Sequence, residues 1–162
     1  MALNAYLMME GDTQGNVEGS CTQAGREGKM EIYGFSHEVI SPRDAASGLP
    51  TGKRQHKPFV VTKPVDKATP ITFNVLVNNE NLSTWRLECW RPSRSGKEFQ
   101  YYSIELTNAS VASVRTEMLN NKYPENMKHE VREHVAYCYQ KITWTWEDGG
   151  ISAEDDWETP VV

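Results

Sequence analysis

Four side chains near residue 130 are of the types that bind zinc and activate water. His129 and Glu130 are followed by Glu133 and His134. A helical pair of zinc-binding histidines must lie four residues apart to share a face, whereas these two lie five apart. The inverted zinc-protease motif would need a histidine where Glu130 stands. We therefore expect a solvated, charged entry to the next strand and no metal site, although metal bound tightly to the purified protein would favour a hydrolase.

Residues Gly48 to Lys53 match a phosphate-binding loop only in part. That loop has four residues between its glycines and a hydroxyl residue after its lysine, whereas here three residues intervene and Arg54 follows Lys53. No serine, histidine and acidic set stands in a recognisable nucleophile motif. The sequence therefore predicts neither nucleotide binding nor enzymatic activity, and no cofactor is expected.

The composition fits a single domain that spans residues 1–162. The chain is 38% hydrophobic and 24% charged, and no apolar run approaches the roughly 18 residues that a membrane span needs. Its formal net charge of -5 argues against nucleic acid as the main partner, because phosphate binding needs a surplus of basic side chains. We expect a protein with no membrane span and no nucleic-acid partner.

The cysteines and the N-terminus indicate where the chain is made. Cys21, Cys89 and Cys138 are odd in number and widely spaced, so we expect reduced, structural thiols. The N-terminus has no basic segment, and Asn4 and Glu10 interrupt the apolar run that a signal peptide requires. Synthesis is expected to end in the cytoplasm, and any export would use a route without a cleaved signal.

Alternation with a period of two dominates the chain and predicts a mainly β fold. It is clearest on both sides of a turn at residues 92–96, where Gly96 would supply the turn conformation of a hairpin. Both faces of the last long segment are apolar, which predicts a strand covered on both sides. The expected strands are residues 3–9, 29–40, 59–63, 85–89, 100–106, 111–118 and 131–146.

One segment, about residues 67–78, departs from this alternation and predicts a short helix. Thr69 can cap it, and Pro70 stands where a first helical turn tolerates proline. The β-branched residues of the segment leave a strand as the alternative. The apolar residues expected on one face of the helix are Phe73, Leu76 and Val77.

The aromatic side chains and the acidic C-terminus each leave more than one role open. Strand aromatics most often fill a core, but they can also form a subunit interface or a sugar-binding face. The acidic residues would form a solvated tail or a surface that meets basic residues of a neighbour. The aromatic residues are Trp85, Trp90, Tyr101, Tyr102, Trp144, Trp146 and Trp157, and the acidic ones are Glu147, Asp148, Glu154, Asp155 and Asp156.

The most unusual stretch is a long loop at about residues 41–57. It holds two prolines, two glycines and a basic run, and structureless loops of this length are uncommon in compact domains unless they bind something. The loop is therefore a candidate assembly interface, with a mobile, solvated loop as the alternative. Its candidate contact residues are Arg43, Asp44, Lys53, Arg54, His56 and Lys57.

Several segments, in order along essentially the whole chain, resemble the haemolysin-coregulated protein family, Hcp. The Met8-Met9 pair and the three cysteines are mild departures from the family pattern. The matching segments are Met1–Leu7, Gly19-Ser20, Gly25–Glu27, His37–Pro58, Trp90–Ser93, Tyr101-Tyr102, Leu106–Ser110, Tyr139–Trp146 and Asp155–Glu158.

The resemblance implies a compact β-barrel of two sheets with one flanking helix. It also implies the inner tube of the bacterial type VI secretion system, built from hexameric rings that stack. The implied partners are further copies of the chain, contractile sheath proteins, the spike protein VgrG, the baseplate and small effectors carried in the lumen. In the family the long loop reaches a neighbouring subunit or ring. A head-to-tail contact between two different patches of one domain can close such a ring.

Two interpretations therefore stand beside each other. The resemblance implies a non-enzymatic tube subunit that is made in the bacterial cytoplasm and then secreted. The alternative is a monomeric ligand-binding β-barrel module that uses its aromatic face. The two differ in whether the purified chain assembles.

Overall fold

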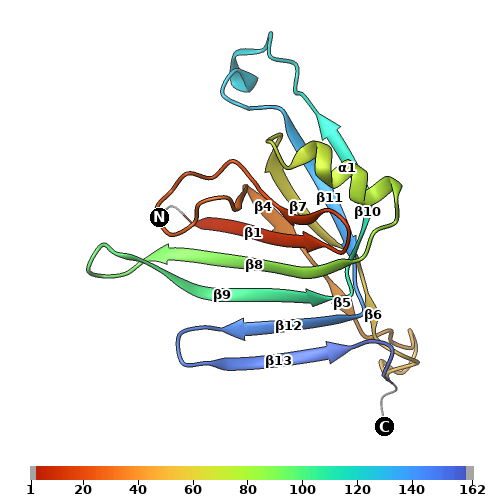
Figure 1. Cartoon of the computed structure of the whole chain (residues 1–162). Helices are drawn as coiled ribbons and strands as arrows, with labels where there is room; N and C mark the ends of the chain where they lie inside the picture. Colours follow the sequence, from red (N-terminus) through yellow and green to blue (C-terminus); the bar gives the residue numbers. More distant parts are fainter. Residues whose placement is uncertain (1–2, 160–162) are drawn as a thin grey trace.

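A computed structural model describes residues 3–159, so Met1 and Ala2 of the segment Met1–Leu7 lie outside the described residues. The described chain holds thirteen β-strands and one α-helix (Figure 1). Its strands form one sheet of seven strands, one of four and one of two. The predicted mainly β fold of two sheets with one helix is confirmed.

The seven-stranded sheet is antiparallel throughout and contains both ends of the described chain. Its members are β1 (Asn4–Gly11), β2 (Gly15–Val17), β3 (Met30–Ile32), β8 (Leu82–Pro92), β9 (Glu98–Thr107), β12 (Lys141–Trp146) and β13 (Ile151–Asp156). The strand order is β13-β12-β9-β8-β1-β2. Strand β3 also pairs with β1, along residues 5–7, whereas β2 pairs with residues 9–11 of β1. The hairpin predicted around Gly96 is confirmed as β8 and β9, with Gly96 at φ +82°.

The four-stranded sheet packs against the first and is also antiparallel. Its members are β4 (Gly34–Ser36), β7 (Phe59–Pro64), β10 (Ser110–Glu117) and β11 (Arg132–Cys138), in the order β10-β11-β7-β4. A separate pair joins β5 (Val39–Ile40) to β6 (Gln55–His56), and a single 3-10 turn, η1, spans Pro124–Asn126. The described pairings give two open sheets packed together and no closed barrel.

The core lies between the two larger sheets and is built around Trp85 of β8. Its indole meets Phe59 of β7 and Tyr137 of β11 edge to face, with ring centroids 5.0 and 5.3 Å apart. These three aromatic residues are fully buried, as are Leu7 and Val135 from opposite sheets. Edge-to-face contacts of this kind add to the stabilisation that apolar burial already provides.

Helix α1 (Thr69–Val77) confirms the predicted helix but shows a different face to the core. Of the three residues expected on the apolar face, Leu76 is partly buried against the core, but Phe73 is 37% and Val77 70% exposed; Thr72 and Val75 are the buried residues. The expected cap is also wrong: Ala68 is the capping residue, and the Thr69 hydroxyl donates to Glu133 instead. Buried positions here are set by contact with β10 and the sheet, so the apolar spacing alone did not identify them.

Two predicted long strands are each divided in the structure. Residues 131–146 form β11 and β12, which belong to different sheets. The buried positions accordingly change from odd-numbered residues, Tyr137 and Tyr139, to the even-numbered Ile142. Residues 29–40 form β3, β4 and β5 in three different sheets. In both cases the chain crosses from one sheet to another without a glycine-proline turn, so no turn signal marks the break.

A buried ion pair corrects the expectation for residues near 130. Glu133 is 0% exposed, and its Oε1 lies 2.7 Å from the Nζ of Lys63, which is 1% exposed. Lys63 also contacts Asp66 at 2.9 Å. The entry to β11 is therefore not uniformly solvated, and Glu133 is a core residue that faces the paired strand β7.

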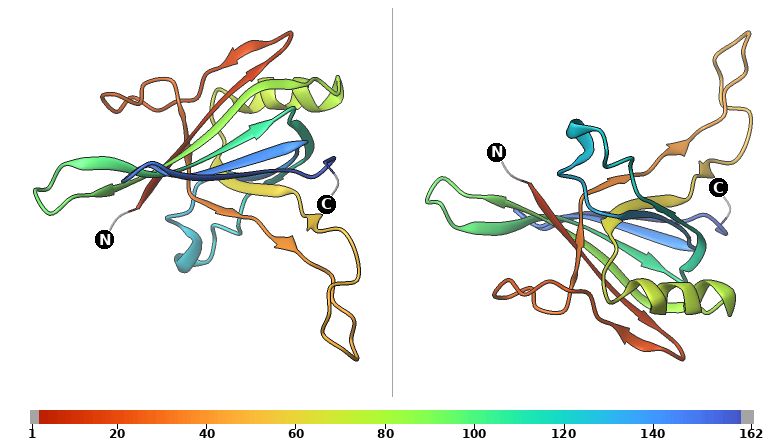
Figure 2. Two further views of the ribbon diagram at one scale, coloured as in Figure 1. Left: turned by 90° about the horizontal axis from the view of Figure 1, so that it is seen from below. Right: turned by 90° about the horizontal axis from the view of Figure 1, so that it is seen from above.

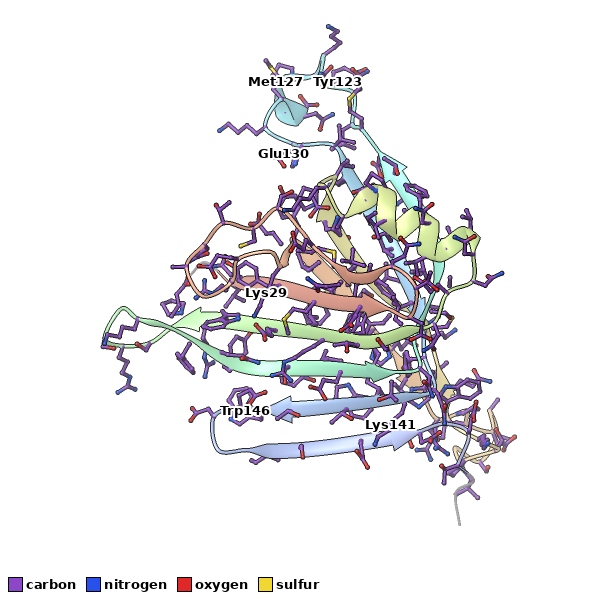
Figure 3. All side chains as sticks on the ribbon, viewed as in Figure 1. Lys29, Tyr123, Met127, Glu130, Lys141 and Trp146 are labelled. Atoms are coloured by element: carbon purple, nitrogen blue, oxygen red, sulfur yellow. The ribbon has the colours of Figure 1, made fainter. Side chains whose placement is uncertain are left out.

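Two segments project from the body. The loop between β10 and β11 carries the exposed side chains Tyr123 and Met127 at its far end (Figure 3). Residues 41–57, called the arm from here on, leave the body at one corner, on the opposite side from α1 (Figure 2). Within residues 3–159, no helix has the length and apolar character needed to cross a membrane.

Candidate assembly interface at the arm

The arm is an ordered hairpin at its base and a tight turn at its tip. At the base, β5 and β6 pair Val39 with His56 and Ile40 with Gln55. Further out, a single bridge joins Arg43 to Pro50. These pairings hold the long loop extended, so it can project rather than fold back on the body.

A second set of contacts stabilises the tip of the arm. The Asp44 carboxylate accepts hydrogen bonds from the backbone N–H and the hydroxyl of Ser47, both at 2.7 Å. These bonds hold the pKa of the Asp44 carboxyl below its usual value. Gly48 follows at φ +72°, a conformation that suits glycine.

Arg54 ties the arm to the last described strand of the body. Its guanidinium donates two parallel hydrogen bonds of 2.7 Å to the Asp155 carboxylate at the end of β13, and a third of 2.7 Å to the Asp156 carbonyl. Forked arginine–carboxylate pairs are among the stronger and more directional ion pairs. The Arg54 hydrogen bond lowers the pKa of the Asp155 carboxyl.

A hydrogen-bonded chain of rings lies beside this ion pair. His56 Nε2 is 2.6 Å from Asp155 Oδ2, and His56 Nδ1 is 2.7 Å from the Tyr139 hydroxyl. The same hydroxyl is 2.7 Å from Nε2 of His37. Burial raises the pKa of Tyr139, and burial together with the nearby His56 lowers the pKa of His37.

The arm and the body enclose a hollow next to these contacts. Its volume is about 720 Å³, and its lining includes His56, Cys138, Tyr139 and Trp157. The indole N–H of Trp157 donates to the Tyr139 carbonyl, which fixes one wall. Arg54 also lines the hollow, which therefore adjoins the contacts that hold the base of the arm to the body.

The predicted arm residues divide into two groups. Arg43, Asp44, Lys53 and Lys57 are exposed and available to a neighbour, whereas Arg54 and His56 are partly buried against the body. His37, Tyr139 and Asp155 also belong to this site, although the sequence did not predict it. The signal was present, because all three lie in segments that resemble the Hcp family and that meet here in space.

The remaining candidates lie elsewhere or take structural roles. The predicted acidic tail is wrong in part, since Asp155 lies in strand β13 and meets Arg54 of its own chain. Trp85 lies in the core, while Trp146 is 37% exposed at the far end of β12 (Figure 3). Among the described side chains, no group of three or more His, Cys, Asp or Glu residues is arranged to hold a metal ion. His129 and His134 therefore belong to no such group.

The sequence and the fold are both similar to those of known proteins. The sequence model described as "Type VI secretion system effector, Hcp" matches residues 6–146. The "Major exported protein" of Pseudomonas aeruginosa is 39% identical over 170 residues, which cover 99% of each chain. A crystal structure of an Hcp protein matches with a TM-score of 0.91 at 28% identity and covers 98% of this chain and 100% of that one. A mutant Hcp1 protein of E. coli EAEC 042 matches with a TM-score of 0.85 at 30% identity, covering 96% and 99%.

The family match includes the arm, most of both large sheets and the crossing at Tyr139. The similar P. aeruginosa chain matches from end to end, and the structural match leaves no large part of the fold unaccounted for. The two-sheet body with its projecting arm is therefore the fold of an Hcp protein, and this chain belongs to the Hcp family of the type VI secretion system.

Proposed function

We propose that this chain is the structural subunit of the inner tube of a type VI secretion system. In this role it closes into hexameric rings, the rings stack, and the tube is secreted with effectors in its lumen. Support comes from membership of the Hcp family and from the printed name of the P. aeruginosa relative, "Major exported protein". The proposal treats residues 1–162 as one tube domain.

This role would also imply particular partners and a particular route of secretion. Contractile sheath proteins would surround the tube, the spike protein VgrG and the baseplate would meet its ends, and small effectors would occupy its lumen. The chain would start in the bacterial cytoplasm and leave by being expelled, without a cleaved signal peptide. This role requires neither enzymatic activity, a cofactor nor nucleic acid.

The observation that carries the proposal is the charge and position of the arm. The arm holds four basic side chains and one acidic one, a net charge of +3, whereas the whole chain has a net charge of -5. The rest of the molecule therefore has a net charge of -8. The basic arm of one copy is complementary in charge to the acidic body of a second copy. Such a head-to-tail contact can close a ring or extend a stack.

The exposed residues of the arm supply the proposed contacts. These are Arg43, Asp44, Lys53 and Lys57, whereas Arg54 and His56 are partly buried in contacts with the body. Arg54→Glu would therefore act in two ways, since it would also place two carboxylates together at the base of the arm. Lys53→Glu changes the same charge without removing that ion pair, so it tests the contact between copies more directly.

The experiment compares assembly of the natural chain, Lys53→Glu and a matched control. Size exclusion with light scattering measures the mass of the rings, and negative-stain microscopy shows rings and stacks. We expect Lys53→Glu to weaken ring closure or stacking, with a larger loss at low salt than at high salt. Lys128→Glu makes the same charge change on an exposed residue in the loop between β10 and β11, and we expect it to assemble normally.

The outcomes separate the proposed role from its alternative. Unchanged assembly of Lys53→Glu would remove the arm from the contact while leaving the tube intact. A natural chain that stays monomeric at every concentration would contradict the tube itself. That result would favour the monomeric ligand-binding module, for which the hollow beside Trp157 would then be the first place to seek a ligand.

A further inference from the structure

We propose that His37, Tyr139, His56 and Asp155 form a proton-operated latch that holds the arm against the body at neutral pH and releases it in acid. The latch lies within one chain and goes beyond the proposed tube function. Its effect on stacking rests on that function, whereas the latch itself can be tested in any assembly state.

The chemistry of the four groups sets the direction of the hydrogen bonds that join them in the latched state. The Asp155 carboxylate can only accept, so His56 Nε2 must carry a proton and donate to it across 2.6 Å. In neutral His56 the other nitrogen, Nδ1, is then an acceptor and receives the Tyr139 O–H at 2.7 Å. His37 Nε2 must therefore donate to the Tyr139 oxygen, also at 2.7 Å. Every group has a partner when both histidines are neutral.

One added proton can be accommodated without opening the chain of bonds. If His56 is protonated, Nδ1 becomes a donor to the Tyr139 oxygen, and the Tyr139 O–H can turn toward His37. His37 then accepts through Nε2 and carries its proton on Nδ1. The positive charge of His56 also lies next to the Asp155 carboxylate. The first proton therefore rearranges the latch but leaves it closed.

A second proton cannot be accommodated in the same geometry. Both imidazoles would then donate to a single oxygen, and the Tyr139 O–H proton would lose both of its imidazole acceptors. Two positive rings would lie on either side of one hydroxyl, each 2.7 Å from it. Tyr139 is only 6% exposed, so water cannot readily replace the lost acceptor. Opening of the arm relieves both the repulsion and the unmade bond.

The surroundings set the direction of the response. Arg54 places a positive charge on the same Asp155 oxygen, Oδ2, that His56 contacts. The Asp156 carbonyl accepts a further hydrogen bond from Arg54. The Cys138 thiol adjoins Tyr139 in the chain, and the ring of Phe59 covers His37 with centroids 5.0 Å apart. Burial and the nearby His56 lower the pKa of His37. Release is therefore expected below the ordinary histidine value of about 6.5.

The sign follows from proton linkage. A histidine whose pKa is lower in the closed arm binds a proton better when the arm is open, so falling pH favours the open arm. One extra proton can shift the equilibrium by at most roughly tenfold per pH unit. If stacked rings depend on arm contacts, a stack would loosen in acid while each chain stays folded.

Hydrogen–deuterium exchange can test the latch in the full chain. The readout is the peptide that contains Gln55 and Lys57, because the Lys57 N–H bonds to the Glu38 carbonyl only while the base of the arm is paired. Exchange would be measured at about pH 7.5 and about pH 5, corrected for intrinsic rates, with β8 as an internal reference for the body. We expect protection of the arm base to be lost in acid while β8 stays protected.

Two variants and a control decide between the latch and a general acid effect. His37→Gln keeps a donor for the Tyr139 oxygen but cannot take a proton, so its arm should stay protected at both pH values. Tyr139→Phe keeps the ring but removes the shared hydroxyl, so its arm should open at neutral pH. His129→Gln, on the exposed loop between β10 and β11, should behave like the natural chain.

Three results would overturn the proposal. They are an arm that stays protected in the natural chain at about pH 5, a His37→Gln arm that opens in acid like the natural one, and a Tyr139→Phe arm that is protected at both pH values. Each is read from the same peptide in samples of matched assembly state, because a neighbouring copy in contact with the arm would also protect it. Failure of the latch is therefore distinguishable from failure of the tube proposal.

Discussion

The buried ion pair between Lys63 and Glu133 allows a sharp prediction about stability. Lys63→Met keeps an unbranched side chain of similar length but removes the charge next to a carboxylate that is 0% exposed. Glu133 would keep only the Thr69 hydroxyl, at 3.1 Å, in place of the ammonium at 2.7 Å. Removing one partner of a buried pair lowers the free energy of unfolding by about 3–5 kcal/mol. The nearby Asp66 would also lose its contact with Lys63.

Urea unfolding measures this change. With a denaturant slope of about 2 kcal/mol per molar, the unfolding midpoint should fall by roughly 2 M. Both proteins must be compared in the same assembly state, because association adds to apparent stability. Arg115→Met is the matched control: Arg115 pairs with Glu117 at 2.9 Å, but its side chain is 65% exposed. That pair should be worth less than about 1 kcal/mol.

A double variant shows whether the uncompensated charge is the cause. Lys63→Met with Glu133→Gln removes both charges and leaves a neutral amide that can still accept from Thr69. Because neutral groups often replace a buried ion pair with little loss, the double variant should recover most of the lost stability. If it is as unstable as Lys63→Met alone, the loss comes from altered packing and the electrostatic reasoning is refuted.

Three further predictions concern backbone packing, thiol reactivity and pH. Gly19→Ala should lower stability by about 1–3 kcal/mol in thermal unfolding, since its Cβ would lie 2.4 Å from a backbone carbonyl oxygen, whereas Gly34→Ala, with open space around its Cβ, should have little effect. Iodoacetamide should modify the exposed Cys138 in the native chain, while Cys89, whose pKa burial raises to about 11, should react only after unfolding, as peptide mapping would show. The lowered pKa of His37 predicts that the free energy of unfolding decreases as pH falls below about 6.5, and His37→Gln should reduce that slope.

The sequence predicted the elements whose side chains meet one environment along their whole length. Strands β8 and β9 pair in one sheet, with the buried Trp85 and Leu87 on either side of the more exposed Arg86, and the turn at Gly96 separates the two strands clearly. Helix α1 was also located, because Pro70 and the change of period mark its start. Its buried face could not be predicted, since the neighbouring strand decides which side of so short a helix is covered.

Segments that change sheets could not be read in the same way. Alternation predicts only which of the two faces of a strand a side chain is on, and it does not predict to which sheet that strand belongs. Both faces of residues 131–146 carry apolar side chains, which hid the change of buried phase near Gln140, where the chain passes from one sheet to the other. The buried Glu133 is a similar case, because its charge suggests solvent until its partner on β7 is known.

The arm shows how far composition can reach toward a site. Its prolines, glycines and basic residues marked it as a binding loop, and four of its six candidate residues are exposed on it. The partner of Arg54, in contrast, lies 101 residues away in the chain, in a segment whose acidic residues suggested a solvated tail. Long-range pairing of this kind depends on the fold and has no counterpart in local spacing.

Tyr139 connects these two kinds of structure and explains why a proton would move the arm rather than unfold the body. It lies between β11 of the four-stranded sheet and β12 of the seven-stranded one, so strands of both sheets adjoin it in the chain. Its carbonyl accepts from Trp157, and its hydroxyl reaches both histidines. His37 and His56, in contrast, flank or belong to the two-residue pairing of β5 and β6, which contributes few backbone hydrogen bonds. When the hydrogen bonds to the Tyr139 hydroxyl break, the segment held by fewer backbone hydrogen bonds opens first, and that segment is the arm.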